Sequence, residues 1–425
     1  MKKTKKVMDF LNSIGVDSGI SSRGEKLDET VISTLYAGVK WFRTGYEGPT
    51  PVEDQIMLHY RTGAKMSYGL CSGGSDIDRL LKGAEELARH GALLSLEGAN
   101  EPNNWSIRHN GKEGGKNLSW LPVAEQQAEL YARVKAHPTL KNYPVFDIGG
   151  ETGAQTDNCG MQFLTIPKGA NTLMPDGTTF ADYANVHNYF CHPSTGGMID
   201  NQTWHAADPL CDKVPGNGGH FDGIYGNYAK TWLKGFDGYS DEEILKMPRV
   251  VTETGVTIGS YNGQITERIQ GCMVSCMFLD QFYHNYDYSA LYILRDRVDE
   301  NGNQTYGMFR PDNSPRLAAD YMHNMTTILR DFGKICETTE LKYEIKNQPE
   351  TVHDMVLQKA NGKYYLIIWG ERFTGGKDEI TINFDKAINA NIYDITAGTN
   401  PIEIINNKNS ISLTMTDHAV IIELQ

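Results

Sequence analysis

The feature that most constrains the fold is an alternation of short apolar runs with longer helical patterns over about the first 330 residues. Several of the apolar runs contain almost no polar residue, as expected for parallel strands that are buried on both faces. Repeated strand–helix alternation predicts a parallel sheet with helices packed outside it. Eight strands are expected, at residues 14–18, 39–43, 64–70, 92–97, 145–148, 183–187, 249–253 and 290–294.

Eight such units in this length predict an α/β chain closed into a (β/α)8 TIM barrel. The helical pattern is clearest at residues 76–90, where apolar residues recur with a period of 3.6 and Gly91 follows as a stop signal. Residues 123–135 and 265–283 have the same pattern. A doubly wound open sheet is the alternative, but no glycine-rich phosphate loop follows the first strand.

The composition changes after about residue 336, where no helical pattern remains. Strand-like runs at 356–359, 364–369, 380–384 and 420–424 are separated by turns rich in Asn, Gly and Asp. We therefore expect a barrel over residues 1–335 and a small all-β sandwich over residues 336–425.

Charge and hydropathy exclude several classes of partner. The net charge is -13 with a pI near 5.4, which disfavours binding to nucleic acid or to an anionic membrane. No window of about 18 apolar residues predicts membrane insertion. The lysine-rich start at residues 2–6 is interpreted as a solvated terminus, and residues 7–12 do not resemble a signal-peptide core. Either the protein stays inside the cell or a signal has been removed; the compartment and the oligomeric state stay open.

Two glutamates stand where barrel enzymes place their catalytic groups, at the carboxyl ends of strands. Glu101 follows Asn100 at the end of the fourth expected strand, and Glu253 ends the seventh. Strands four and seven face each other across the mouth of an eight-stranded barrel. Glycoside cleavage needs such a pair, one carboxyl to protonate the leaving oxygen and one to attack the anomeric carbon or activate water.

These residues resemble those of a known family. Asn100–Pro102 is similar to the Asn-Glu-Pro signature of glycoside hydrolase clan A, in which the glutamate is the acid/base. Glu253 matches the position of that clan's nucleophile, and the trailing β domain resembles the layout of family 39. The resemblance implies a retaining glycosidase that acts on an oligo- or polysaccharide through a covalent glycosyl-enzyme, with Glu101 as acid/base and Glu253 as nucleophile.

The resemblance extends to supporting residues. Arg43 on the second strand is similar to the clan's arginine near the nucleophile, and would hold Glu253 ionised. His187 and Tyr189 resemble its His-x-Tyr, whose tyrosine hydroxyl contacts the nucleophile; His187 is expected to pack and hydrogen-bond rather than titrate in the reaction. Asn100 would hold the 2-hydroxyl of the sugar.

Aromatic residues near the strand ends are candidates for sugar contacts. Trp105 follows the Asn-Glu-Pro loop, and Tyr292 lies on the eighth strand, where many clan members place a tryptophan. Glu47, Glu97 and Glu151 also lie near strand ends, where they bind substrate or face solvent.

No metal or cofactor is expected, because the 12 histidines show no ligand spacing. Two alternatives stay open: a barrel that binds carbohydrate without cleaving it, and an enzyme that acts on sugars by transglycosylation or elimination.

Overall fold

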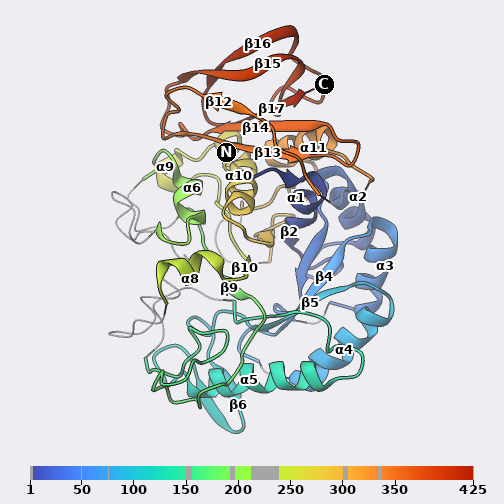
Figure 1. Cartoon of the computed structure of the whole chain (residues 1–425). Helices are drawn as coiled ribbons and strands as arrows, with labels where there is room; N and C mark the ends of the chain where they lie inside the picture. Colours follow the sequence, from blue (N-terminus) through green and yellow to red (C-terminus); the bar gives the residue numbers. More distant parts are fainter. Residues whose placement is uncertain are drawn as a thin grey trace.

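The computed structural model describes residues 3–48, 50–74, 76–149, 156–191, 197–211, 239–299, 305–333 and 337–424; Glu151 lies outside these ranges. Figure 1 shows a barrel of strands and helices with a separate layer of strands packed on one side of it.

The barrel contains eight parallel strands, each at a place that the sequence predicts. Their order around the barrel is β8-β5-β4-β3-β2-β11-β10-β9. Closure between β8 and β9 depends on one bridge, Phe146 with Tyr183, beside which Asp147 N donates to Tyr183 O at 3.0 Å. The strands are β2 (Ile14–Asp17), β3 (Trp41–Thr44), β4 (Lys65–Leu70), β5 (Leu93–Ala99), β8 (Val145–Phe146), β9 (Ala184–Val186), β10 (Arg249–Val251) and β11 (Tyr288–Leu291).

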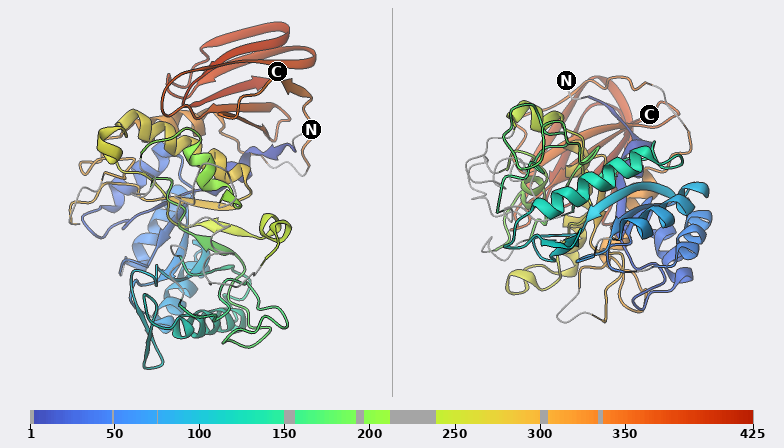
Figure 2. Two further views of the ribbon diagram at one scale, coloured as in Figure 1. Left: turned by 90° about the vertical axis from the view of Figure 1, so that its left-hand side faces the viewer. Right: turned by 90° about the horizontal axis from the view of Figure 1, so that it is seen from below.

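Helices surround the strands in Figure 1, and in the view from below in Figure 2 the teal helix Leu121–Ala136 crosses in front of the barrel. The helix predicted at 76–90 begins after Asp76, whose side chain accepts a hydrogen bond from Arg79 N at 3.0 Å, and buries its apolar face. The helices are α1 (Val7–Ser13), α2 (Leu27–Ala37), α3 (Val52–Thr62), α4 (Ile77–Arg89), α5 (Leu121–Ala136), α6 (Gln202–Ala207), α8 (Asp241–Lys246), α9 (Ser260–Gly263), α10 (Glu267–Tyr283) and α11 (Leu317–Ile328). Within the described ranges, every helix is too short or too polar to cross a bilayer.

A mostly antiparallel sheet follows the barrel, as expected for the C-terminal region. The strand order is β1-β13-β14-β17-β15-β12, and β16 pairs with β15. The first part of β15 pairs with β12 and the last part with β17, so this long strand joins the two halves of the sheet around a buried apolar cluster. The strands are β12 (Tyr343–Ile345), β13 (Val352–Gln358), β14 (Tyr364–Gly370), β15 (Asp378–Asp394), β16 (Glu403–Met415) and β17 (Ala419–Leu424). A small hairpin, β6 (Ile107–His109) and β7 (Lys112–Gly114), follows the Glu101 loop.

The N-terminus belongs to this C-terminal sheet, which the sequence does not reveal. Strand β1 (Lys5–Lys6) pairs in parallel with β13, and Lys5 Nζ donates to the carbonyls of Phe282 at 2.5 Å and Tyr283 at 3.2 Å. The expectation of a solvated lysine-rich terminus is therefore wrong at Lys5. The physical reason is that the last carbonyls of α10 lack partners within the helix and attract a cation.

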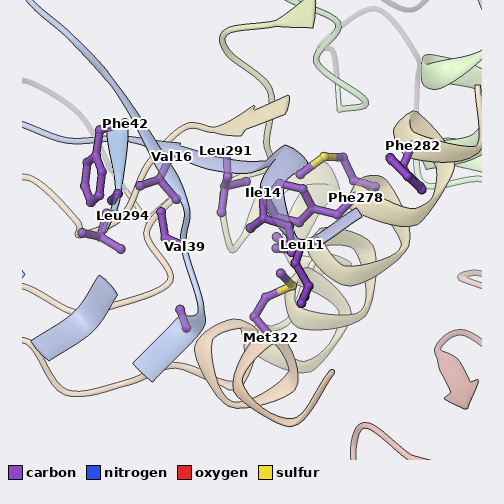
Figure 3. Close-up of a cluster of buried hydrophobic side chains, with 14 of the residues drawn as sticks. Leu11, Ile14, Val16, Val39, Phe42, Phe278, Phe282, Leu291, Leu294 and Met322 are labelled. Atoms are coloured by element: carbon purple, nitrogen blue, oxygen red, sulfur yellow. The ribbon is translucent and has the colours of Figure 1, made fainter. Parts of the chain in front are cut away.

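Strand β14 joins two cores. Trp369 and Ile367 lie in the same buried cluster as Phe278 of α10 and Leu11 of α1, whereas Ile368 points into the core of the β domain. Figure 3 shows part of the shared cluster, with Leu11 and Phe278 near the barrel strands. Helix α10 is buried on all sides from Gln270 to Phe282, because it lies between the barrel and the sheet.

Candidate active site

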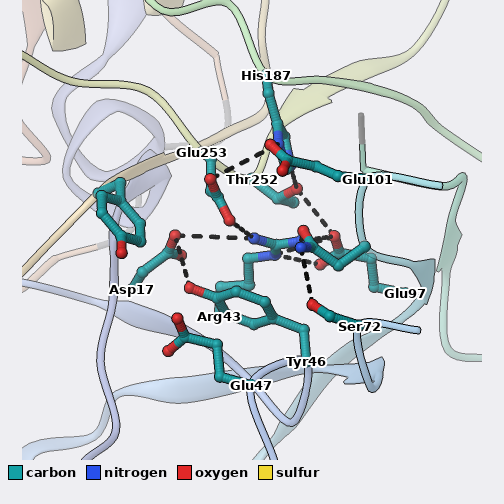
Figure 4. A network of polar contacts seen from close by, with 12 residues as sticks. Asp17, Arg43, Tyr46, Glu47, Ser72, Glu97, Glu101, His187, Thr252 and Glu253 are labelled. Atoms are coloured by element: carbon teal, nitrogen blue, oxygen red, sulfur yellow. Dashed lines mark hydrogen bonds and ion pairs between the residues drawn. The ribbon is translucent and has the colours of Figure 1, made fainter. Parts of the chain in front are cut away.

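Arg43 is the centre of the polar network at the carboxyl ends of the strands (Figure 4). Its side chain is fully buried on β3 and divides its donors among three partners. Nε donates to both oxygens of Glu97 at 3.0 Å, Nη1 donates to Glu253 at 2.5 Å, and Nη2 donates to Asn100 Oδ1 at 2.7 Å. The guanidinium thus fixes three predicted strand-end residues in one geometry.

Glu253 lies two residues beyond β10 and is 6% exposed. One of its oxygens accepts the short hydrogen bond from Arg43, and the other accepts from Tyr189 Oη at 2.9 Å. Two donors therefore hold the carboxylate at a fixed rotation and stabilise its charge.

Glu101 is held by an unusual backbone conformation. Its φ is +42°, a left-handed conformation that is costly for a residue with a Cβ and often found at functional sites. The Glu101 N–H donates to Gly149 O at 2.5 Å, which ties the turn to the next strand end. Asn104 Nδ2 donates to the carboxylate at 3.1 Å, so the loop after Glu101 also orients the side chain.

His187 stands between the two glutamates. Its Nδ1 lies 2.8 Å from Glu101 Oε1 and 3.7 Å from Glu253 Oε2. One carboxylate oxygen of each glutamate and one ring nitrogen of His187 all lie within 4.8 Å of one another. The structure therefore brings the two predicted carboxylates together, and places His187 in direct contact with Glu101.

The hydrogen bonds around His187 assign one of its protons. Nε2 lies 3.1 Å from Thr252 Oγ1, and that hydroxyl is 2.9 Å from both Glu97 Oε1 and Asn185 Oδ1. Thr252 donates to one of these oxygens, so it accepts from His187 and Nε2 carries a hydrogen. The remaining proton lies on the line between His187 Nδ1 and Glu101.

The two glutamates have opposite pKa shifts. Burial raises the pKa of Glu253 and the charge of Glu101 adds to the rise, while His187, Arg43 and Tyr189 act against it. Burial also acts to raise the pKa of Glu101, but the hydrogen bond and charge of His187 outweigh it, and the pKa is lowered. Glu101 thus loses its proton more readily than an isolated carboxyl would.

Three further carboxylates lie in or around the network. Glu97 is fully buried against Arg43, which excludes solvent exposure, one of the two alternatives left open for it. Its position inside an apolar strand was the signal that could have shown its role. Glu47 forms ion pairs with Arg297 and, at 3.0 Å, with Arg23. Asp17 on β2 is also buried, and burial raises its pKa well above the ordinary value.

The predicted sugar-contacting residues lie in different settings. Both ends of the Asn100 amide are hydrogen-bonded. Its Oδ1 accepts from Arg43 Nη2, and its Nδ2 donates to Ser72 Oγ at 3.0 Å. Tyr292 packs edge-on against Tyr306, with ring centroids 5.6 Å apart. Trp105 is 52% exposed on the loop after Glu101, which leaves its ring accessible.

Among the residues that the structure describes, Glu101, His187 and Glu253 have the spacing of possible metal ligands. Arg43 already places a positive charge on Glu253, which opposes a cation there. The donor set fits an acid/base pair better than a metal site.

No family model and no curated protein matches the sequence. Many solved structures share its fold at low sequence identity, among them the following three. A family 39 glycoside hydrolase from the gut symbiont Bacteroides cellulosilyticus WH2 has a TM-score of 0.57 at 14% identity, over 99% of this chain and 83% of that one. A family 51 α-L-arabinofuranosidase from Bifidobacterium longum has a TM-score of 0.59 at 10% identity, over 98% and 96%.

A 4-O-α-L-rhamnosyl-β-D-glucuronidase from Fusarium oxysporum 12S has a TM-score of 0.58 at 10% identity, over 99% of this chain and 97% of that one. In each case the match covers nearly all of this chain, so the barrel and the β domain are shared together. The chain thus has the TIM-barrel fold with an appended β domain that the resemblance to glycoside hydrolase clan A implied.

Proposed function

We propose that the protein is a retaining glycosidase that cleaves an O-glycosidic bond through a covalent intermediate on Glu253. The observation that carries the proposal is the approach of Glu101 and Glu253, from opposite sides of the barrel, to within 4.8 Å. Retaining enzymes place their two carboxyls about 5 to 5.5 Å apart, whereas inverting enzymes leave about 6.5 to 9.5 Å for a water molecule. The short spacing supports direct attack by a carboxylate.

In the first step, Glu253 attacks the anomeric carbon while the bond to the leaving oxygen breaks and that oxygen takes a proton from Glu101. In the second step, Glu101 removes a proton from water, and the water oxygen displaces Glu253 from the sugar. Arg43 and Tyr189 hold Glu253 in place for attack and bind its charge again when the intermediate breaks down.

The proton that the leaving group receives is held jointly by Glu101 and His187. A proton between His187 Nδ1 and the Glu101 carboxylate, which lie 2.8 Å apart, is within reach of both groups. Passing it to Glu101 as the leaving oxygen accumulates charge requires no movement of either side chain. The three structural neighbours described above are glycosidases by their names, which supports this reaction class.

The test compares wild type with Glu253→Ala and Glu101→Ala on a panel of aryl and oligosaccharide glycosides. We expect Glu253→Ala to abolish turnover, and azide to restore it with a product of the opposite anomeric configuration. Glu101→Ala should slow substrates with poor leaving groups by about 10² to 10⁴-fold, and activated dinitrophenyl glycosides far less.

Glu113→Ala, at an exposed carboxylate on β7, is the matched control and should retain full activity. Hydrolysis that survives in both active-site variants would disprove the assignment of the site. Binding of oligosaccharides by a wild-type protein that cleaves none of the panel would favour a carbohydrate-binding barrel.

A further inference from the structure

A cavity of about 820 Å³ lies beside the carboxylates and has no part in the chemistry described above. It is lined by the segments that follow strands β9, β10 and β11 at the carboxyl end of the barrel. Its lining includes Cys191, Ser260, Tyr261, Asn262, Gln264 and Tyr306. A volume of this size lies within the range of about 300 to 1,000 Å³ that is typical of small-molecule sites.

The cavity shares a wall with the candidate catalytic centre. Cys191 lies two residues after Tyr189, and the lining residue Thr257 lies four residues after Glu253. The ring of Tyr306 packs edge-on against that of Tyr189 at 6.2 Å, and Tyr189 donates directly to Glu253. The ring pair of Tyr189 and Tyr306 therefore connects the lining of the cavity to the groups that hold Glu253.

The lining residues carry hydroxyl, amide, thiol and aromatic groups, and the lining that the structure describes contains no charged side chain. Tyrosine rings suit the C–H faces of sugar rings, and amides and hydroxyls can donate to and accept from sugar hydroxyls. A uronate, sulfate or phosphate group would lose hydration here without gaining a counter-charge. The lining therefore favours an uncharged sugar.

Charged groups lie elsewhere around the network. Glu47 is paired with Arg23 and Arg297, and Arg23 also pairs with Asp299 at 2.9 Å. These charged groups come from the segments after β2, β3 and β11, and none of them is among the described residues that line the cavity.

We propose that the cavity is a second sugar subsite that binds an uncharged glycosyl unit of an oligosaccharide whose cleaved bond lies between Glu101 and Glu253. The proposal rests on the proposed function, and it specifies the substrate as longer than a single glycoside. It assigns to Tyr261 and Asn262 a role in holding the substrate, separate from the carboxylate chemistry.

The first test fills the cavity. Ser260→Trp puts a large ring at a half-buried lining position, and Ser410→Trp makes the same change on the exposed strand β16 as a control. The probes are nitrophenyl monoglycosides, the neutral tetramers cellotetraose, xylotetraose and arabinotetraose, and tetragalacturonic acid. For the best neutral tetramer, we expect Ser260→Trp to lower kcat/KM by about ten-fold or more. The monoglycoside should change by less than about two-fold, and Ser410→Trp should match wild type.

A second variant distinguishes the loss of a substrate contact from misfolding. Asn262 has a φ of +56°, so Asn262→Gly removes the amide while the backbone keeps a conformation that glycine adopts freely. We expect KM for the neutral tetramer to rise by about three- to ten-fold with the monoglycoside unchanged. Loss of activity on the tetramer and the monoglycoside alike in this variant would contradict a separate subsite.

Binding to Glu253→Gln, measured by calorimetry with the same tetramers, separates failure of the subsite from failure of the proposed function. Binding of a neutral tetramer that Ser260→Trp abolishes supports the subsite, even if wild type hydrolyses nothing. If wild type cleaves glycosides through Glu253 but binds no neutral tetramer, the subsite is disproved and the proposed function stands. A Ser260→Trp variant that behaves like wild type would also disprove the subsite. Tighter binding of tetragalacturonic acid would overturn the preference for uncharged sugar.

Discussion

At the scale of single residues, Tyr189 contributes to the protonation equilibrium of the proposed nucleophile, Glu253. Its hydroxyl is one of the groups that lower the pKa of Glu253 against burial. Removing this donor in Tyr189→Phe should raise that pKa further. The acid limb of kcat/KM, where protonation of Glu253 stops attack, should then move to higher pH. A hydrogen bond to a charged group contributes about 1.5 to 3 kcal/mol, so kcat should fall by at least about ten-fold.

The measurement is a pH–rate profile on one aryl glycoside for wild type, Tyr189→Phe and the matched Tyr292→Phe. The hydroxyl of Tyr292 lies 3.4 Å from Arg297 Nη1, on the same rim of the barrel. Tyr292→Phe should leave the acid limb in place. An acid limb that stays unchanged in Tyr189→Phe would mean that Glu253 does not set it.

At the scale of secondary-structure elements, a buried pair of acids joins α10 to the end of β14. Asp280 and Glu371 are both fully buried, and Asp280 Oδ1 accepts from Trp369 Nε1 at 2.7 Å. Burial raises the pKa of Asp280 well above its ordinary value, and the charge of Glu371 raises it further. Asp280 therefore keeps its proton in the folded protein and shares it with Glu371.

This pair makes stability depend on pH in a definite direction. A carboxyl with a raised folded-state pKa contributes its full stability below about pH 4, and loses it as pH rises toward the folded-state value. The unfolding free energy should therefore fall by up to about 1.4 kcal/mol per pH unit in that window. Asp280→Asn keeps a donor for Glu371 and an acceptor for Trp369, so the fall should be smaller. Urea titrations between pH 5 and 9 test this, and the exposed Asp385→Asn should behave like wild type.

Helices and strands with a regular pattern of apolar residues could be predicted from the sequence, whereas strands without such a pattern could not. All eight barrel strands are confirmed. Strand β16 was not predicted, because its residues are mostly polar and exposed and it is held only by pairing with β15. The extension of β15 to Asp394 was missed for the same reason.

For the candidate site, the sequence placed Glu101 and Glu253 at strand ends, because strand periodicity and barrel geometry suffice for that. It did not place Glu97 against Arg43, since this contact depends on the register across β3, β4 and β5. The direct contact of His187 with Glu101 depends equally on how far each loop turns inward after its strand.

At the scale of the whole molecule, the boundary near residue 336 stays a prediction, and the packing suggests that it does not separate two independent folding units. Trp369 and Ile367 of β14 belong to the same core cluster as Phe278 of α10. Strand β1, at the start of the chain, pairs with β13 of the β domain. A chain ending at residue 335 would expose the buried faces of α10 and lose the partner of β1, so we expect it to aggregate.

The same packing predicts that the barrel and the β domain unfold together. Trp369→Ala removes a fully buried side chain from the shared core and should cost about 3 to 5 kcal/mol. Ile368→Ala, the adjacent residue on the opposite face of β14, removes a side chain from the core of the β domain alone, at about 2 to 5 kcal/mol. In calorimetry both variants should show one transition at a lower Tm, because the shared cluster couples the two parts. Two transitions, with only one of them moved by Ile368→Ala, would mean that the β domain folds on its own and that the shared core is an interface between domains.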